Sequence, residues 1–368
     1  MIVKPTDMKK ILICLLCAFG AMVPLLGQNS DADLFSGVVI NNKSGNLDYM
    51  REGDANKESG IKNDEFALYK MGKSPDILLR LISFKLAQEQ GLQLQAPISQ
   101  YIGSDFTSYN DSITVNMLLN HTSGLRDIDM VNEYQFALKG NESLSSILEG
   151  SNGVQVIDSL KESYHFSLLN NLLLIEVLQR ATGKSISKLL NEMLIIPLQL
   201  NHTIYWVPGE TSNTETQAAD ITASYLSDEP ATRSELSAKM LSSQYTARAL
   251  QLETNEYDKV KTDLYKVEVP EENLLRFFTC ANDLQVVLDK LSGNELLNDE
   301  YKNLFFKSIN CNLNHLKSSS DYSFNYYISY LGLYLRIRYD VSENNYCLML
   351  SNSSESVANQ YFTSLVKP

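Results

Sequence analysis

Short apolar runs of extended character mark the two ends of the chain. Near the start, Phe35–Ile40 is β-branched and apolar, Asn41–Asn46 is rich in turn residues, and Leu47–Met50 resumes the extended pattern. This succession is typical of a β-hairpin. Near the end, Tyr326–Tyr339 and Tyr346–Leu350 are two more extended runs, rich in Tyr, Ile and Leu. The pattern therefore predicts strands from both ends of the chain.

Between these ends the apolar positions follow helical spacing. They recur every three or four residues over 77–87, and Gly91 supplies a C-terminal stop. A start signal precedes them, because Ser74 can cap the free amides, Pro75 is favoured at the first helical position and Asp76 suits the helix dipole. A second, strongly apolar helix is predicted over 168–181, and residues 357–366 can close the chain as a helix.

The pattern of the first 27 residues indicates a targeting segment that is not part of the fold. Lys9 and Lys10 are basic and Ile11–Leu26 carries no charge, which is typical of a secretory signal peptide. A retained membrane anchor is the alternative, but an apolar run of about 16 residues is short for a span. We therefore predict a cleavable signal peptide over 1–27 and a secreted or periplasmic protein.

The rest of the chain, residues 28–368, is long enough for one large domain or two modest ones. It carries 28 basic against 43 acidic residues, a net charge of −15. This balance argues against nucleic acid and anionic lipid as partners. Cys280, Cys311 and Cys347 remain after signal removal. Their wide spacing indicates three buried thiols or at most one disulfide.

Several segments then occur in a fixed order. G-L-Q-L at 91–94 is followed by Pro97, by Y-I at 101–102 and by LLNHTSGL at 118–125. This order resembles the serine β-lactamase superfamily, in the branch with class C β-lactamases, DD-peptidases and related esterases. Farther on, three more stretches are similar to segments of that family. They are residues 170–190, residues 197–203, and residues 277–288, which match a helix start.

The resemblance implies an α/β (α+β) fold of the β-lactamase/transpeptidase type. An antiparallel sheet from both chain ends, about 28–70 and 285–368, would be flanked by helices. A mostly helical half, about 71–284, would be inserted, and residues 126–235 would belong to its helical region. A cleft would lie between the two halves.

The nucleophile of this family is missing from its expected place. In the family, S-x-x-K at the start of a long helix supplies a serine and the lysine that takes its proton. Counted back from the downstream segments, Lys70 stands at the serine position, and the motif has become KMGK over 70–73. Because the start signal comes later, we expect the helix to begin about one turn late, with Lys70 and Lys73 on a loop before it. Ser74 cannot take over by the same logic, because its lysine position is Ile77.

The other two catalytic motifs are also degenerate. The Y-x-N dyad falls on Phe166 and Leu168, with Ser167 between them. The edge-strand motif, H-x-G or K-T-G, falls on Tyr326 when Gly332 is placed on the glycine that follows it. SISK over 185–188 and YKN over 301–303 imitate two of the motifs outside their family context, as is expected by chance in a chain rich in Ser, Lys and Asn.

The imidazole of His121 could act as a general base or a ligand, but the resemblance implies a structural role beside the site. The structural element consists of His121, Thr122, Ser123 and Gly124. The remaining histidines, His165, His202 and His315, show no metal-ligand spacing. We expect no metal and no cofactor.

Loss of the nucleophile together with the second dyad predicts a pseudoenzyme. We expect a secreted β-lactamase-related protein with a binding role in the bacterial envelope. The ligand would be a peptidoglycan-type peptide, a D-amino-acid compound or a protein partner. The alternatives are an active esterase, D-aminopeptidase or DD-carboxypeptidase-like enzyme with relocated catalytic residues, and a purely structural paralogue. The predicted binding cleft is lined by Lys70, Lys73, Phe166, Ser167 and Tyr326.

Overall fold

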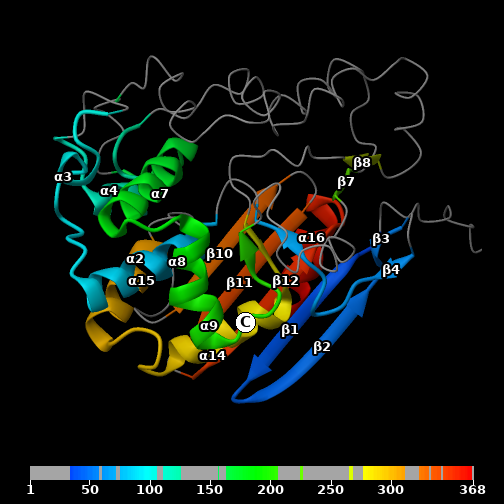
Figure 1. Ribbon diagram of the computed structural model, residues 1–368. Coiled ribbons are helices and arrows are strands. Elements are labelled where there is room, and N and C mark those ends of the chain that lie inside the picture. Colours follow the sequence, from blue (N-terminus) through cyan, green and yellow to red (C-terminus); the bar gives the residue numbers. More distant parts are fainter. Residues whose placement is uncertain are drawn as a thin grey trace, which may run out of the picture.

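A five-stranded antiparallel sheet joins the two ends of the chain (Figure 1). Its order is β10-β11-β12-β1-β2, so the first strand lies beside the last one, with Ile40 opposite Leu348. The strands are β1 (Gly37–Lys43), β2 (Asn46–Glu52), β10 (Ser323–Tyr330), β11 (Leu333–Asp340) and β12 (Asn345–Ser351). The predicted hairpin forms, with a tighter turn than expected, because only Ser44 and Gly45 lie between β1 and β2, both at positive φ.

This computed structural model describes residues 34–57, 60–71, 75–105, 111–125, 156, 163–205, 224–226, 265–267, 277–310, 323–330, 333–340 and 343–366. The predicted signal peptide, Lys73, Ser74, Cys311, Gly332 and most of 126–235 lie outside the described residues. No described helix is long and apolar enough to cross a membrane.

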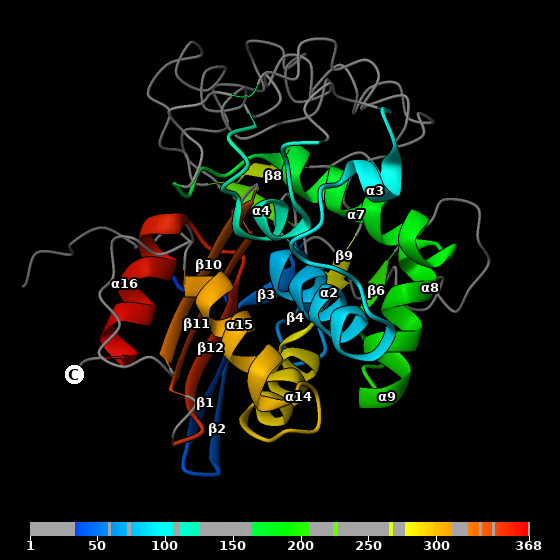
Figure 2. The same ribbon diagram turned by 90° about the vertical axis from the view of Figure 1, so that its left-hand side faces the viewer.

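Helices cover both faces of the sheet (Figure 2). On one face, α16 (Glu355–Leu365) packs Ala358 and Phe362 against Val39 and Met349 of the sheet. The opposite face meets α14 (Ala281–Ser292) and α15 (Asp299–Asn310). This face belongs to the main hydrophobic core. The alternation of side chains along each strand places neighbouring residues in two separate apolar layers.

The helix α2 (Asp76–Gln90) runs through the main core, and its residues 76–87 are all buried. A helix buried on all sides needs apolar residues around its circumference, which the sequence supplies. The other helices of this region are α3 (Ser99–Ile102), α4 (Val115–Asn120), α7 (Leu168–Thr182), α8 (Ile186–Leu190), the π-helix η3 (Asn191–Ile195) and α9 (Ile196–Leu198). Pro75 occupies the N-cap position of α2 instead of the first helical position, and its carbonyl accepts from Leu78 and Leu79 N–H.

The structure has short strands at three places where the sequence analysis expected a loop or a helix. Lys70 lies in strand β5 (Tyr69–Lys70) and not on a loop, because β5 pairs with β9 (Phe277–Thr279) and Met71 N–H donates to Phe277 O at 2.9 Å. The first residues of the expected helix start, 277–279, are therefore a strand, held between β5 and β6 (Ile204–Tyr205). Within the region expected to be helical, residues 204–205 and 224–226 form strands.

The remaining strands pair in twos: β3 (Asp54–Asn56) with β4 (Ile61–Lys62), and β7 (Ser224–Leu226) with β8 (Tyr265–Val267). Strands only two or three residues long carry no periodic signal in the sequence. The division of the chain into a sheet half and a helical half, with the residue bounds given above, stays a prediction.

Candidate functional site

A carboxylate is buried in the first turn of α2, six residues after Lys70, which stands at the expected nucleophile position. Asp76 is 3 % exposed, and its Oδ1 lies 3.2 Å from His121 Nε2. Its Oδ2 lies 3.9 Å from Nη1 of Arg80, one turn along the helix. Arg80 is 1 % exposed and donates from Nη2 to Leu119 O at 2.6 Å. A carboxylate is favourable at a helix N-terminus, but at this depth its charge also needs such partners.

The ring of His121 connects three segments of the chain. Its residue ends α4 in the left-handed conformation, with φ 52°. On the Nδ1 side, Asn170 Nδ2 lies at 3.2 Å and Ser167 N–H donates at 3.4 Å. Because donors face Nδ1 and a carboxylate faces Nε2, the ring carries its proton on Nε2. His121 thereby holds the starts of α2 and α7 against the end of α4.

Ser123 continues this network. Its Oγ donates to Asn170 Oδ1 at 2.6 Å and accepts from Leu125 N–H at 3.1 Å. Asn170 thus uses its amide between Ser123 and His121, and all three side chains are buried. A buried polar network of this kind fixes local geometry when its members are paired.

The segment at the expected second dyad offers no proton relay. The Phe166 ring stacks on His121 with centroids 4.9 Å apart. Ser167 caps α7 and accepts from Leu169 N–H at 3.2 Å. Leu168 is 2 % exposed and belongs to the core. Ser167, expected to line a cleft, has its side chain buried at the helix cap.

Two tyrosines close the cluster from other elements. Tyr326 of β10 is 3 % exposed, and burial together with the charge of Asp76 raises its pKa well above its usual value. The same two causes raise the pKa of Tyr164 to about 12, with Arg80 acting in the opposite direction. The Tyr164 ring also meets the His121 ring edge-on at 5.8 Å. Both phenols stay protonated at neutral pH. Tyr326, expected to line a cleft, is instead a core residue.

Two of the segments singled out from the sequence lie close together in space. The segment 166–168 and Tyr326 lie around His121 and Asp76, at the start of α2. The sequence analysis missed the roles of Asp76, Arg80 and Asn170. Arg80 carried the useful signal, because it is a charge inside an apolar helix and stands four residues after an Asp, the spacing of an intrahelical ion pair.

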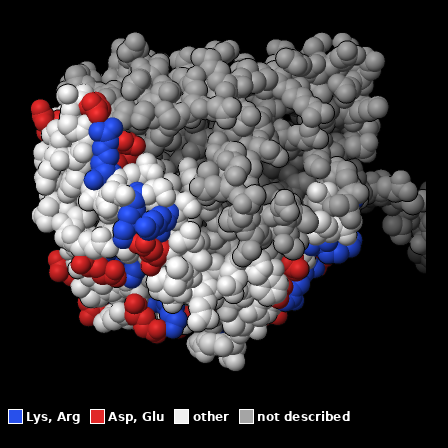
Figure 3. Space-filling view, in the orientation of Figure 1, with Lys and Arg blue, Asp and Glu red and all other residues white. Residues whose placement is uncertain are grey.

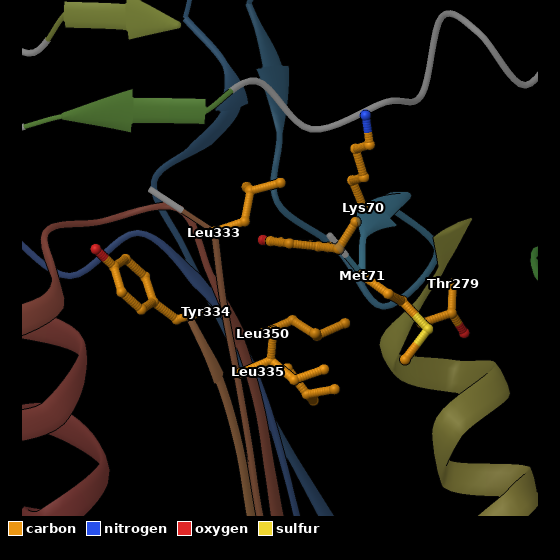
Figure 4. A pocket seen from close by; sticks show the side chains of 9 residues that line it. Lys70, Met71, Thr279, Leu333, Tyr334, Leu335 and Leu350 are labelled. Atoms are coloured by element: carbon orange, nitrogen blue, oxygen red, sulfur yellow. The ribbon is translucent and has the colours of Figure 1, made fainter. Parts of the chain in front are cut away.

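Lys70 lies beside this cluster, at a shallow depression between β5 and the large sheet (Figure 4). The lining is mostly apolar, with Met71, Leu333, Leu335 and Leu350. The Lys70 side chain points away from these residues in Figure 4, and its Nζ lies 5.9 Å from the centroid of the Phe278 ring. The cavity volume of about 10 Å³ is close to what a single water needs.

The motif look-alike at 185–188 has a structural use. Ser185 caps α8 and accepts from Lys188 N–H at 3.2 Å. The side chain of Lys188 is 60 % exposed and lies 3.9 Å from Glu192. The other look-alike, residues 301–303, lies within α15.

Comparison with known proteins adds relatives by sequence. The chain is 26% identical over 148 residues to Protein flp of Staphylococcus aureus (strain MW2), which covers 39% of this chain and 29% of that protein. It is 26% identical over 179 residues to Teichoic acid D-alanine hydrolase of Staphylococcus aureus, covering 48% of this chain and 42% of that protein. The chain therefore aligns with less than half the length of these relatives.

Comparison by structure gives the same family of folds. FmtA from Staphylococcus aureus superposes with a TM-score of 0.62 and 15% identity, covering 98% of this chain and 88% of that chain. This likeness confirms the predicted fold class. The family model described as Beta-lactamase matches residues 81–308, more than half of the sequence. The chain therefore belongs to the β-lactamase family.

Proposed function

We propose that this member of the β-lactamase family does not carry out acyl transfer and acts by binding in the bacterial envelope. The observation that carries the proposal is the pairing of Asp76 with Arg80 and His121 in the first turn of α2. A hydrolase of this family needs a nucleophile and its base beside this turn, and the expected nucleophile position is Lys70. Here the turn holds a buried carboxylate that lies against Arg80 and His121.

The state of the second dyad supports the same conclusion. Phe166 has no hydroxyl and Leu168 has no amide, so neither can relay a proton to a leaving group. Tyr326 keeps its proton because of its raised pKa. Both ring nitrogens of His121 have partners, because Nε2 lies against Asp76 and Nδ1 lies against Asn170.

The envelope location rests on the predicted signal peptide over 1–27. The ligand class to test first is a D-alanyl compound, because one relative is named Teichoic acid D-alanine hydrolase. The depression beside Lys70 is too small to enclose a peptide, so binding there would use its rim and the Lys70 ammonium. The acidic balance of residues 28–368, a net charge of −15, favours a protein partner as the alternative ligand. The described part of the face in Figure 3 mixes acidic and basic side chains.

Intact-mass spectrometry tests the loss of acyl chemistry. The purified mature protein is incubated with a β-lactam and, separately, with a fluorophosphonate, and its folding is checked by circular dichroism. We expect no adduct with either reagent. A stoichiometric adduct mapped to a serine would overturn the proposal. Ser74 is the serine to examine first, because it precedes the start of α2 by two residues, and Ser74→Ala is the matched control.

The binding role is tested separately by calorimetry with a D-alanyl-D-alanine peptide. We expect measurable affinity that falls several-fold in Lys70→Ala, because the ammonium is the charged group at the depression. Lys302→Ala is the control, since this lysine lies on α15 and does not line the depression. Equal affinity of both variants would contradict binding at the depression.

A further inference from the structure

Three side chains that can bind a metal meet where β6, β9 and α14 come together. The imidazole of His202, the thiol of Cys280 and the carboxylate of Asp283 each offer one ligand atom, and these atoms all lie within 4.8 Å of one another. Cys280 is 0 % exposed and Asp283 is 1 % exposed. The ligands of one tetrahedral zinc ion lie on the order of 3.5 Å apart, so a small shift of side chains brings these three to that spacing.

His202 contributes an unpaired nitrogen. Its Nδ1 is buried and has no hydrogen-bond partner among the described residues. A buried polar atom without a partner costs about 1 to 3 kcal/mol. The ring packs against Phe66, with centroids 5.2 Å apart. A cation bound by this nitrogen would give it the partner that it lacks among the described residues.

The carboxylate of Asp283 is already held in place by the protein. Its Oδ2 accepts from His202 N–H at 2.8 Å and from Thr203 Oγ1 at 2.9 Å. Thr203 Oγ1 in turn lies 2.9 Å from Thr279 Oγ1. Ligands of metal sites are commonly oriented by such outer hydrogen bonds, and a carboxylate has lone pairs left for a cation after accepting two of them.

Cys280 completes the set from the N-cap of α14. Its Sγ accepts from Asp283 N–H at 3.4 Å. A bound divalent cation favours the thiolate form of a cysteine ligand.

We propose that His202, Cys280 and Asp283 form a binding site for a zinc-type divalent cation. A set of one imidazole, one thiolate and one carboxylate suits Zn²⁺ and does not suit Mg²⁺ or Ca²⁺. Three protein ligands leave a fourth position for water. The ion joins the segment before β6 to the start of α14, and this role is independent of the serine chemistry. The spacing of residues along the chain hides the site, because His202 and Cys280 are far apart in sequence.

Zinc content of the purified full-length mature chain tests the site. After dialysis against Zn²⁺ and removal of free ion, we expect about one zinc per chain. Replacement of Zn²⁺ by Co²⁺ gives the near-ultraviolet absorption of a thiolate–cobalt bond. Cys280→Ser and His202→Gln each lower the zinc affinity at least tenfold. The serine in Cys280→Ser can still cap α14, so the fold is retained in that variant.

Matched variants separate this site from other thiols and imidazoles. Cys347→Ser changes a buried free cysteine in the sheet, and His165→Gln changes an exposed histidine. Both are expected to bind zinc like the parent chain. Folded parent protein without stoichiometric zinc, a cobalt complex without the thiolate band, or a band that persists in Cys280→Ser would each overturn the proposal. The first two results need no variant, so misfolding of a variant does not obscure them.

Discussion

His121 and Asp76 stand 45 positions apart in the sequence, yet Nε2 of one lies 3.2 Å from Oδ1 of the other. Both side chains are buried. The pair joins the end of α4 to the start of α2, and Arg80 adds a second partner for the same carboxylate.

Arg80→Met removes the cation that faces Asp76 and leaves the carboxylate with His121. Breaking a buried ion pair from one side costs about 3 to 5 kcal/mol, so we expect the free energy of unfolding to fall by about that amount. The measurement is urea unfolding followed by circular dichroism. The double variant Asp76→Asn with Arg80→Met removes both charges and should recover part of the loss. A double variant less stable than Arg80→Met would contradict the pairing.

The raised pKa of Tyr164 predicts that the folded state loses stability at alkaline pH. The folded protein raises the pKa of Tyr164 to about 12, whereas an unfolded tyrosine titrates near 10. The protonated phenol is therefore favoured in the folded state. This contribution is complete below pH 10 and is lost as the pH rises from 10 to 12. Tyr164→Phe should lower the pH dependence of stability in that window by about 1 to 2 kcal/mol. An unchanged slope in unfolding experiments would show that Tyr164 is not responsible.

Rebuilding the second dyad should not restore catalysis. Phe166→Tyr is expected to be tolerated, because the ring can keep its stacking on His121. Leu168→Asn places an amide in the core and should cost about 2 to 4 kcal/mol, the combined effect of lost apolar burial and an unpaired polar group. Neither variant, alone or combined, should form an adduct with a β-lactam in intact-mass measurements. Acylation of the double variant would mean that a nucleophile is already present.

A substitution at Gly53 should disturb a polar network at the end of the large sheet. A Cβ at Gly53 would lie 2.5 Å from Ser36 Oγ. That hydroxyl donates to Asn352 Oδ1 at 2.8 Å and accepts from Asn63 Nδ2 at 2.9 Å. Gly53→Ala should lower the free energy of unfolding by about 2 to 4 kcal/mol, from the positive φ and the overpacking together.

Gly60→Ala is the matched control for this prediction. Gly60 has φ +69° against +67° for Gly53, and a Cβ there would meet nothing within 4 Å. Its cost should be about 1 kcal/mol, from the backbone conformation alone. Equal losses in thermal or urea unfolding would mean that contact with Ser36 is unimportant.

Much of the fold could be predicted because it depends on local patterns. The hairpin of β1 and β2, the helices α2, α7 and α16, and the late start of α2 all follow from alternation, helical spacing or a start signal. The strand at Lys70 could not be predicted in this way. It is two residues long and exists only because β9 pairs with it.

The candidate site also has a part that local sequence patterns predict and a part that depends on tertiary contacts. The sequence by itself determined the local elements, and the identification of Phe166 and Leu168 as changed motif positions stays a prediction from motif spacing. Only the tertiary structure decided what these residues contact. The pairing of Asp76 with His121 and Arg80, and the meeting of His202 with Cys280 and Asp283, join segments far apart in the chain. The energy of such contacts depends on burial and distance in space, and neither quantity is encoded in the spacing of residues along a sequence.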